Sequence, residues 1–550
     1  MKIALAQLNF HIGNFESNRD QIIRNIEKAK GEGAELVVFS ELAVCGYYPN
    51  DLLERLEFVD RCIDSVKRIA AHCQGIAALV GAPSINSSPK GKMLFNSAYF
   101  LKNGRVESVH SKTLLPTYDV FDEYRHFEPN HTFELIKLNG LKLAVTICED
   151  LWYNQPVFSA FGRENLYSVC PAEEYSRQNP DLIINLSASP FSYNQSKLRK
   201  NILLDNAKKY KVPIIYVNQV GAQTELIFDG GSLFVDCKGN IVCEMAYFSG
   251  DFKIIDTENQ NNQQILQQET ETIAKIHDAL VLGIRDYFSK TGFKSATLGL
   301  SGGIDSAVTL VLAEKALGAA NIHVLLMPSR FSSDHSIDDA VKLADNLGVK
   351  YDIIKIHDIV DAFDTSLISV FKKLPPDITE ENIQARVRGT LLMGLSNKFG
   401  HILLNTSNKS EAAVGYGTLY GDMNGGLSVL GDVYKTDVVG LAKYINRNGE
   451  VIPFNTIIKS PSAELRPNQK DSDTLPDYGV LDKILFEYIE LAKSPAAIIA
   501  MGFDEAMVYG TVLMVNRNEY KRFQTPPILR VSSKAFGFGR KMPLVAKYAL

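Results

Sequence analysis

A glycine-containing loop between a short apolar run and a helix is the feature that most constrains this chain. Residues 296–300 are apolar, residues 301–306 read Ser-Gly-Gly-Ile-Asp-Ser, and residues 307–312 begin an apolar helix. Adjacent glycines let consecutive backbone N–H groups converge, and the helix adds the positive end of its dipole, so the turn suits a phosphate or pyrophosphate. The loop lacks the motif of a Walker A and the spacing of a dinucleotide fingerprint. Asp305 would repel a bare phosphate, which predicts a magnesium ion bound together with the phosphates.

This loop resembles the pyrophosphate loop of the ATP-pyrophosphatase superfamily, whose members split ATP into AMP and pyrophosphate to activate a substrate oxygen. The resemblance implies ATP as a co-substrate and leaves the acceptor open. The ATP-binding residues that it implies are Gly299, Leu300, Ser301, Gly302, Gly303, Ile304, Asp305 and Ser306.

Length and composition limit the remaining possibilities. A chain of 550 residues predicts at least two domains, and 45% hydrophobic with 22% charged residues is typical of globular proteins. The net charge of −5 argues against nucleic acid as a partner. No apolar run approaches the roughly 20 residues that a membrane span needs, and the first residues read as a strand rather than a signal peptide. Seven cysteines without a Cys-x-x-Cys pair predict reduced thiols in the cytoplasm.

Apolar runs alternate with amphipathic helices in both halves of the chain. In the first half we expect Ser17 to cap a helix with Ile22, Ile26 and Ala29 on one face, and strands near 35–39, 76–80, 141–147, 181–185 and 212–218. In the second half we expect a helix at 337–347 and strands at 322–327, 351–356 and 401–405. These patterns predict a layered α/β domain followed by a Rossmann-like, doubly wound parallel sheet that binds ligands beyond the carboxyl ends of its strands.

A polar segment separates the two halves. Residues 257–272 are rich in Gln, Asn and Glu, which predicts a linker between a domain at 1–256 and a domain at 273–550.

Three motifs in the first half indicate a function only when they are considered together. Cys148 follows the apolar run 141–147 at a predicted strand end, although a single free cysteine is more often a small core residue. Glu41 and Lys112, taken alone, would be solvated charges. Together the segments around them, at 39–42, 112–116 and 147–152, resemble the nitrilase and amidase superfamily, whose members use a Glu-Lys-Cys triad in this chain order. The resemblance covers roughly residues 1–255 and implies a nitrilase-like αββα sandwich.

The chemistry of the triad explains why a carboxylate, an amine and a thiol occur at these three positions. Glu41 would take the proton from Cys148, which attacks an amide, while Lys112 and backbone N–H groups stabilise the oxyanion. The resemblance implies that Glu123 orients Lys112. By similarity to relatives that use glutamine, Tyr118 and Ser189 contact the substrate. The basic residue that those relatives place six positions after this serine is here Gln195, so either Gln195 or Lys197 makes the contact.

The combination of the two halves resembles the family of glutamine-dependent NAD synthetases over nearly the whole chain. Other enzymes with this pyrophosphate loop obtain ammonia differently: asparagine synthetase uses an N-terminal cysteine, and GMP synthetase uses an amidotransferase with a different nucleophile motif. The resemblance implies that a deamido-NAD carboxylate attacks ATP, and that ammonia from glutamine then displaces AMP. It implies ATP contacts at Thr406, Lys435 and Ser460, deamido-NAD contacts at Asn382, Arg386, Glu411 and Lys521, and Mg²⁺ ligands at Asp305 and Glu411.

Other functions remain open at this point. Another ATP-pyrophosphatase amidoligase, such as a tRNA-modifying enzyme, would keep the loop and change the acceptor, but it predicts a basic patch that this acidic chain lacks. A binding module without turnover would require broken catalytic positions. We expect small-molecule substrates, a homo-oligomer, and a shielded passage for ammonia.

Overall fold

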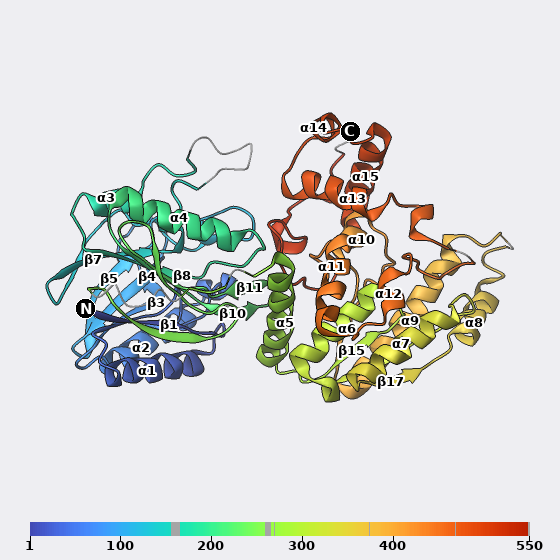
Figure 1. The fold of residues 1–550 in the computed structure, drawn as a ribbon, viewed down its shortest axis with the longest axis horizontal. Coiled ribbons are helices and arrows are strands. Elements are labelled where there is room, and N and C mark those ends of the chain that lie inside the picture. The colour runs from blue at the N-terminus through green and yellow to red at the C-terminus, as the bar shows by residue number, and fades with distance from the viewer. Residues whose placement is uncertain (156–164, 259–265, 269, 373, 468, 548–550) are drawn as a thin grey trace. The chain divides into compact units, whose positions relative to one another are not determined.

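The computed structural model describes residues 1–155, 165–258, 266–268, 270–372, 374–467 and 469–547 (Figure 1). The chain divides into two compact units, Met1–Glu269 and Thr270–Leu550. Within the predicted linker, residues 259–265 and 269 lie outside the described residues. No helix in the described part of the chain is long and apolar enough to cross a membrane.

The first unit contains two six-stranded sheets, each with parallel strands at its centre and antiparallel strands at its edges. The first sheet has the order β14 (Asp251–Asp256), β1 (Lys2–Gln7), β2 (Leu36–Val38), β3 (Ala77–Ile85), β4 (Leu94–Lys102) and β5 (Arg105–Ser111). The second has the order β13 (Ile241–Glu244), β12 (Leu233–Val235), β9 (Ile214–Asn218), β8 (Leu182–Ser187), β7 (Leu141–Ile147) and β6 (Ile136–Leu138). A separate hairpin joins β10 (Val220–Gln223) to β11 (Leu226–Asp229).

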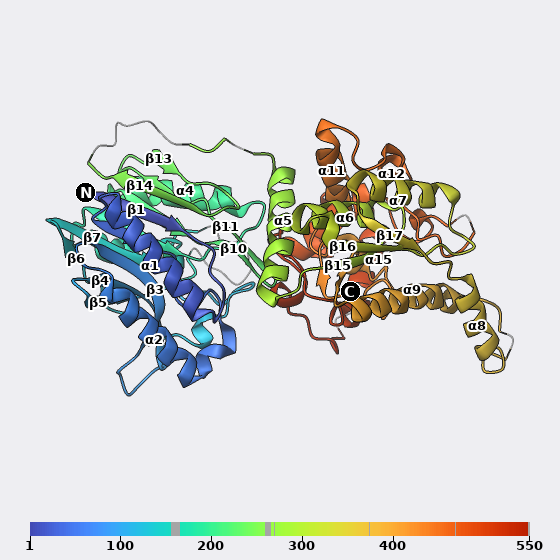
Figure 2. The ribbon, with the colours of Figure 1, turned by 90° about the horizontal axis from the view of Figure 1, so that it is seen from below.

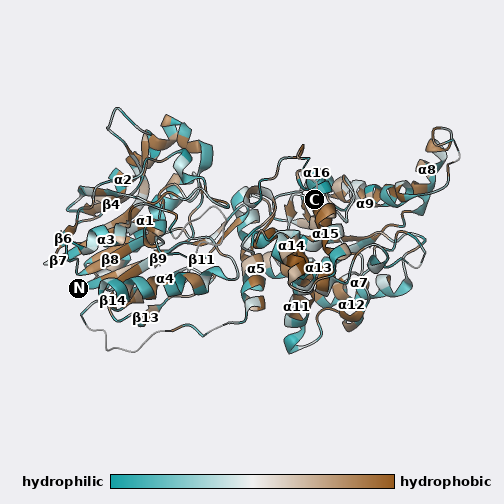
Figure 3. Ribbon diagram, turned by 90° about the horizontal axis from the view of Figure 1, so that it is seen from above, coloured by the Kyte–Doolittle hydropathy of each residue, from teal (hydrophilic) through white to brown (hydrophobic). Residues whose placement is uncertain are grey.

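Helices cover the outer face of each sheet (Figures 1 and 2). They are α1 (Phe15–Gly31) and α2 (Leu56–Ala71) on the first sheet, and α3 (Pro171–Ser176) and α4 (Gln195–Tyr210) on the second. Alternation along β9 builds the layers: Ile215 and Val217 lie in the core between the sheets, whereas Ile214 and Tyr216 pack on the helix side. The predicted αββα sandwich is confirmed, with hydrophobic strands inside and hydrophilic helix faces outside (Figure 3).

The predicted cap of the first helix is wrong by three positions. The Asn14 side chain accepts a hydrogen bond from the Ser17 backbone N–H at 3.2 Å, so Asn14 is the N-cap and Ser17 lies in the first turn. Asparagine and serine are equally good caps, and the hydrophobic spacing does not distinguish between them.

The second unit contains a five-stranded parallel sheet, which confirms the predicted doubly wound fold. Its order is β17 (Lys350–Ile353), β16 (Ile322–Leu326), β15 (Ala296–Gly299), β18 (Ile402–Asn405) and β19 (Leu427–Ser428). The strand order reverses between β15 and β18, so the loops that follow these two strands meet at the carboxyl edge of the sheet. That edge is where ligands bind in such folds.

The other elements of both units are helical. The longer helices of the second unit are α5 (Thr272–Thr291), α6 (Ile304–Leu317), α7 (Asp334–Leu347), α8 (His357–Leu367), α9 (Ile378–Phe399), α11 (Lys435–Ile445), α13 (Tyr478–Leu485) and α15 (Glu505–Arg517). The shorter ones are α10 (Lys409–Val414), α12 (Phe454–Ile458), α14 (Pro495–Ala500) and α16 (Glu519–Arg522). Single turns are η1 (Asn50–Glu54), η2 (Glu123–Arg125) and η3 (Cys148–Leu151) in the first unit, and η4 (Ala319–Asn321), η5 (Asn446–Asn448), η6 (Asp471–Asp473), η7 (Phe486–Glu490) and η8 (Gly537–Gly539) in the second.

Candidate active sites

Cys148 occupies a sharp turn at the end of β7. The strand ends at Ile147, and Cys148 has a φ of +42°, a conformation that is costly for a residue with a side chain. The residue is only 6% exposed. A buried, strained residue between a strand and a helical turn is the arrangement that presents a nucleophile in many hydrolases.

Asp150 ties this turn to the segment that carries Lys112. One carboxylate oxygen accepts hydrogen bonds from the N–H groups of Thr113 at 2.9 Å and Leu114 at 2.8 Å. The other accepts from the N–H of Ile147 at 2.9 Å. Asp150 was not among the predicted site residues, although it lies within the motif around Cys148. It positions the amine and the thiol with respect to each other.

Lys112 is fully buried between two carboxylates. Its Nζ donates to Glu41 Oε1 at 2.7 Å and to Glu123 Oε1 at 2.8 Å. Burial by itself would lower the pKa of Lys112, but Glu123 and Glu41 reverse this and raise the pKa well above its usual range. The amine is therefore a fixed positive charge inside the unit.

Glu41 has the surroundings of a general base. Besides Lys112, it accepts hydrogen bonds from Asn96 Nδ2 at 2.7 Å and from the N–H of Ala188 at 2.9 Å. Burial raises the pKa of Glu41, Lys112 opposes this, and the charge of Glu123 adds to it, which brings the pKa to about 7. A base with a pKa near neutrality transfers protons efficiently at physiological pH.

The Cys148 thiol is protonated at rest, because burial and the nearby Glu41 charge raise its pKa well above the usual range. Lys112 acts in the opposite direction. The structure thus brings the predicted triad together: Glu41 and Lys112 are hydrogen-bonded, and both act electrostatically on Cys148. Glu123 bonds to Lys112, as the resemblance implied.

Glu149 is a site residue that the sequence reasoning missed. Its Oε1 accepts hydrogen bonds from the Tyr118 hydroxyl at 2.8 Å, from Gln155 Nε2 at 2.8 Å and from the Tyr167 hydroxyl at 2.9 Å. Burial raises the pKa of this carboxyl, and the three donors oppose the rise. Its position directly after Cys148 in the sequence is the feature from which its place in the site could have been predicted. Tyr118 thereby lies at a carboxylate beside the nucleophile.

The remaining glutamine-binding predictions concern one loop and one helix. Ser189 is buried, and its N–H donates to Asn218 Oδ1 at 2.9 Å. Gln195 begins α4 and is partly exposed, whereas Lys197 is exposed on the same helix. Arg199, one turn further, is paired with both Asp229 oxygens at 2.8 and 3.0 Å.

The acid side of the pH profile should depend on Glu123. Glu41 accepts a proton only when it is ionised, so kcat/KM for glutamine hydrolysis should fall about tenfold for each pH unit below about 7. Replacing Glu123 by Gln removes a negative charge that raises the Glu41 pKa, so the acid limb should move to lower pH. Initial rates of glutamate formation across pH test this. A limb that stays in place or moves to higher pH would contradict the assignment of Glu41 as the base.

The loop at 301–306 is fixed by its own side chains. The Ser301 and Ser306 hydroxyls lie 3.1 Å apart, and Ser301 Oγ accepts from the N–H of Gly303 at 3.2 Å. Gly302 has a φ of +78°, and a Cβ there would lie 2.2 Å from the Ser336 carbonyl oxygen. Only glycine fits this position, both conformationally and sterically.

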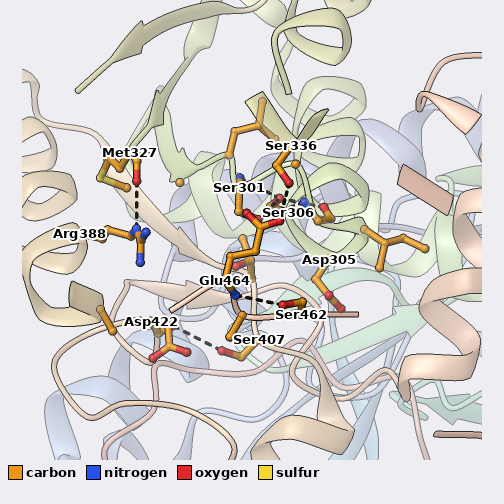
Figure 4. Close-up of a pocket in the computed structure, with 18 of the residues that line it drawn as sticks. Ser301, Asp305, Ser306, Met327, Ser336, Arg388, Ser407, Asp422, Ser462 and Glu464 are labelled. Atoms are coloured by element: carbon orange, nitrogen blue, oxygen red, sulfur yellow. Dashed lines mark hydrogen bonds between the residues drawn. The ribbon is translucent and has the colours of Figure 1, made fainter. Parts of the chain in front are cut away.

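These residues line a cavity of about 310 Å³ at the switch point of the sheet. Figure 4 shows Ser301 and Ser306 from the loop, Arg388 from α9 and Glu464 from the segment after α12 around it. All the ATP-binding residues that the sequence implied line this cavity, namely Gly299, Leu300, Ser301, Gly302, Gly303, Ile304, Asp305, Ser306, Thr406, Lys435 and Ser460. Its apolar part includes Leu325, Met327, Leu392 and Leu403.

A buried charge cluster forms one wall of this cavity. Lys435 Nζ contacts Asp305 Oδ2 and lies 3.5 Å from Glu411 Oε1, and Asn408 Nδ2 donates to Asp305 Oδ1 at 2.9 Å. Burial, followed by the charge of Asp305, raises the pKa of Glu411 to about 8. Two carboxylates with one amine between them leave a site that attracts a cation.

Three of the predicted deamido-NAD contacts lie around the turn at residues 415–419 and not among the described residues that line the cavity. The Thr418 hydroxyl donates to Asn382 at 2.6 Å, Arg386 Nε donates to the Leu419 carbonyl at 3.2 Å, and Lys521 Nζ donates to the Gly415 and Gly417 carbonyls at 2.8 Å each. Among the described residues that line the cavity, Asn382, Arg386 and Lys521 do not occur, whereas Glu411 does.

Arg388 lines the cavity two residues after Arg386. Its Nε donates to the Met327 carbonyl at 3.1 Å, and burial lowers its pKa to about 10. No role was predicted for Arg388 from the sequence. A helix displays residues two apart on different faces, and only the packing of α9 shows which face is turned to the cavity.

The fold and the sites together define a two-part class of enzyme: a carbon-nitrogen hydrolase unit joined to a nucleotide-binding α/β unit. The family model described as Carbon-nitrogen hydrolase matches residues 2–258, and the one described as NAD synthase matches residues 276–525. The chain is 43% identical to a glutamine-dependent NAD(+) synthetase of Synechocystis, with 99% of each chain covered. It is 42% identical to that of Acinetobacter baylyi, with 99% and 98% covered. The chain belongs to the family of glutamine-dependent NAD(+) synthetases.

Solved structures agree with this membership. A glutamine-dependent NAD+ synthetase from Acinetobacter baumannii, in complex with ADP, has a TM-score of 0.78 and 40% identity, and the match covers 100% of this chain and 99% of that one. A synthetase from Cytophaga hutchinsonii, at 22% identity and a TM-score of 0.84, covers 100% of this chain and 98% of its own and shows the same fold.

Proposed function

We propose that this chain amidates deamido-NAD to NAD, using ATP and the amide nitrogen of glutamine. The observation that carries the proposal is that each unit holds a complete set of reactive groups: a base, an amine and a thiol in the first, and a phosphate loop with a charge cluster in the second. Such a pairing serves a reaction in which one site makes ammonia and the other consumes it.

The first unit releases ammonia by covalent catalysis. Cys148 Sγ attacks the side-chain amide carbon of glutamine while Glu41 takes the thiol proton, and Lys112 stabilises the negative oxygen that forms. The carbon–nitrogen bond breaks as the nitrogen receives the proton from Glu41, leaving a thioester on Cys148. Water, deprotonated by Glu41, then cleaves the thioester and yields glutamate.

Glutamine is held by its charged end. The Glu149 carboxylate suits the α-ammonium group, with Tyr118 fixing its orientation through their hydrogen bond. Ser189 contributes to the polar end of the substrate, and Gln195 or Lys197 contacts the carboxylate.

The second unit activates the acceptor. A carboxylate oxygen of the nicotinate ring attacks the α-phosphorus of ATP, and pyrophosphate departs against the backbone N–H groups of the 301–306 loop and Lys435. Ammonia then attacks the adenylated carbonyl carbon, AMP leaves, and the amide is NAD. Thr406 and Ser460 contact ATP, while Asn382, Arg386, Glu411 and Lys521 hold deamido-NAD.

The charge cluster fits a magnesium ion. Asp305 and Glu411 supply the carboxylate oxygens that Mg²⁺ prefers, and a bound cation would offset the burial and the Asp305 charge that raise the pKa of Glu411 to about 8. When bound, Mg²⁺ would neutralise charge on the pyrophosphate.

We also propose a homo-oligomer in a reducing cytoplasm. The exposed apolar side chains Phe363, Ile368, Val370 and Leu374 support association, and the seven free thiols support the reducing setting.

Product analysis with isotopic labelling tests the proposal. The purified chain, given deamido-NAD labelled with ¹⁸O in its carboxylate, ATP, Mg²⁺ and glutamine, should form NAD, AMP and pyrophosphate. One ¹⁸O atom should appear in AMP, since the carboxylate oxygen stays on the α-phosphorus. Formation of ADP and phosphate, or AMP without the label, would contradict the adenylation step, and AMP without NAD would point to another acceptor.

A further inference from the structure

A second cluster of metal-binding side chains lies in the first unit, on two single-turn helices. Asp51 and Glu54 belong to η1, and His126 directly follows η2. Each offers one ligand atom, and these three atoms lie within 4.8 Å of one another. Within the described part of the chain, this is the one group of three His, Cys, Asp or Glu side chains placed in this way.

The imidazole of His126 is aimed into this cluster. Its side chain is 6% exposed, and its buried Nε2 has no hydrogen-bond partner among the described residues. The same atom lies 3.4 Å from Asp51 Oδ1 and 3.7 Å from Glu54 Oε1. A buried nitrogen without a hydrogen bond is costly, so its orientation toward two acids requires an explanation.

The other ring nitrogen of His126, Nδ1, is held by a hydrogen bond, as it is in histidines that bind metals. His126 Nδ1 lies 2.7 Å from the Tyr48 hydroxyl, and that hydroxyl has the Asp122 carbonyl as an acceptor at 3.3 Å. The Tyr48 oxygen is then free to accept the proton of Nδ1, which leaves the lone pair of the ring on Nε2. Metal-binding histidines are oriented by such a hydrogen bond from the second ring nitrogen.

Arg125 competes for the same acids. Its guanidinium lies 3.0 Å from Asp51 and 3.5 Å from Glu54, and its side chain is half exposed. The carboxylate side chains are themselves 65% and 59% exposed, so all three can rearrange at little cost, the arginine outward and the acids onto an ion.

We propose that Asp51, Glu54 and His126 form a binding site for a divalent transition metal of the Zn²⁺ or Co²⁺ type, with water completing the coordination. One imidazole nitrogen with two carboxylates is a ligand set for such ions, whereas Mg²⁺ prefers oxygen ligands alone. The site is separate from the Asp305 and Glu411 pair, which lies in the other unit.

Metal binding by the full chain, without ATP, tests the proposal. Zn²⁺ is titrated calorimetrically into the chelator-treated protein, and Co²⁺ binding is followed by its visible absorption. The Asp51→Asn/Glu54→Gln double variant should lose one equivalent or bind it at least about tenfold more weakly. These exposed substitutions do not touch the core. His126→Gln should weaken the same equivalent.

A matched control lies on α3. Glu173, which is half exposed, and Glu174, which is one-third exposed, form an acid pair that contacts Arg177 at 3.0 and 2.7 Å. Glu173→Gln/Glu174→Gln should leave metal binding unchanged.

Arg125→Ala should increase the affinity for the metal ion whose binding the Asp51→Asn/Glu54→Gln variant loses, because it removes the competing cation. The proposal is overturned if wild type and Asp51→Asn/Glu54→Gln bind the same number of equivalents with equal affinity, or if His126→Gln binds as wild type does, since the acids then act only as partners of Arg125.

Discussion

Replacement of Cys148 by alanine is expected to abolish NAD formation from glutamine and to leave formation from ammonium salts nearly unchanged. The thiol is the only atom that we assign to bond formation with glutamine, so its loss should reduce that rate by about 10³-fold or more. Ammonia supplied from solution bypasses the first unit and needs only the adenylated intermediate. NAD formation is measured with each nitrogen donor, at high ammonium concentration and alkaline pH.

A second cysteine provides the control for this substitution. Cys243 is also buried, at the edge strand β13, and has no role in the proposed chemistry. Cys243→Ala should therefore retain both activities. Undiminished use of glutamine by Cys148→Ala would refute the triad. Equal loss with both donors would show instead that Cys148 supports the structure.

Gly302→Ala should abolish NAD formation with both nitrogen donors. The added Cβ would lie 2.2 Å from the Ser336 carbonyl oxygen at a φ of +78°, so the loop or the start of α7 must move. Since the loop N–H groups stabilise pyrophosphate only in their present arrangement, we expect a loss on the order of 10²-fold or more. AMP and NAD formation are measured together.

Gly348 is the matched control, because it shares the backbone conformation without the crowding. It has a φ of +65° at the C-cap of α7, and a Cβ there would meet nothing within 4 Å. Gly348→Ala should lower the free energy of unfolding by about 1 kcal/mol and keep the activity. If Gly302→Ala remained as active as Gly348→Ala, the assigned phosphate site would be wrong.

The chemically reactive residues could be found from sequence because their motifs are local. Ser301 to Ser306 are marked by glycines between a strand and a helix, whereas Cys148 is recognised only together with the motifs around Glu41 and Lys112, through their resemblance to the nitrilase and amidase superfamily. The groups that tune them could not be found in this way. Asn96 comes from β4 of the first sheet and reaches Glu41 across that sheet, whereas the Ala188 N–H follows β8 of the second sheet and reaches Glu41 only after the two sheets pack.

Helix faces and caps show the same limit. The capping residue of α1 is Asn14 rather than Ser17, because both suit the role and only the backbone conformation selects one. Arg388 rather than Arg386 lines the nucleotide cavity, since the rotation of α9 about its axis is set by packing and not by the charge of either residue.

The sequence by itself determined the two-part α/β architecture and the phosphate-type turn, because alternating apolar runs and glycine-hinged loops specify local backbone shape. The Glu-Lys-Cys order came from the resemblance of three motifs to the nitrilase and amidase superfamily. Only the tertiary structure decided how these groups are charged. The pKa of Glu41 near 7, the protonated thiol of Cys148 and the acid pair at Lys435 arise from burial and from charges that are far apart in the chain. Removal from water and proximity of charges are properties of the folded molecule, and no short segment of sequence contains them.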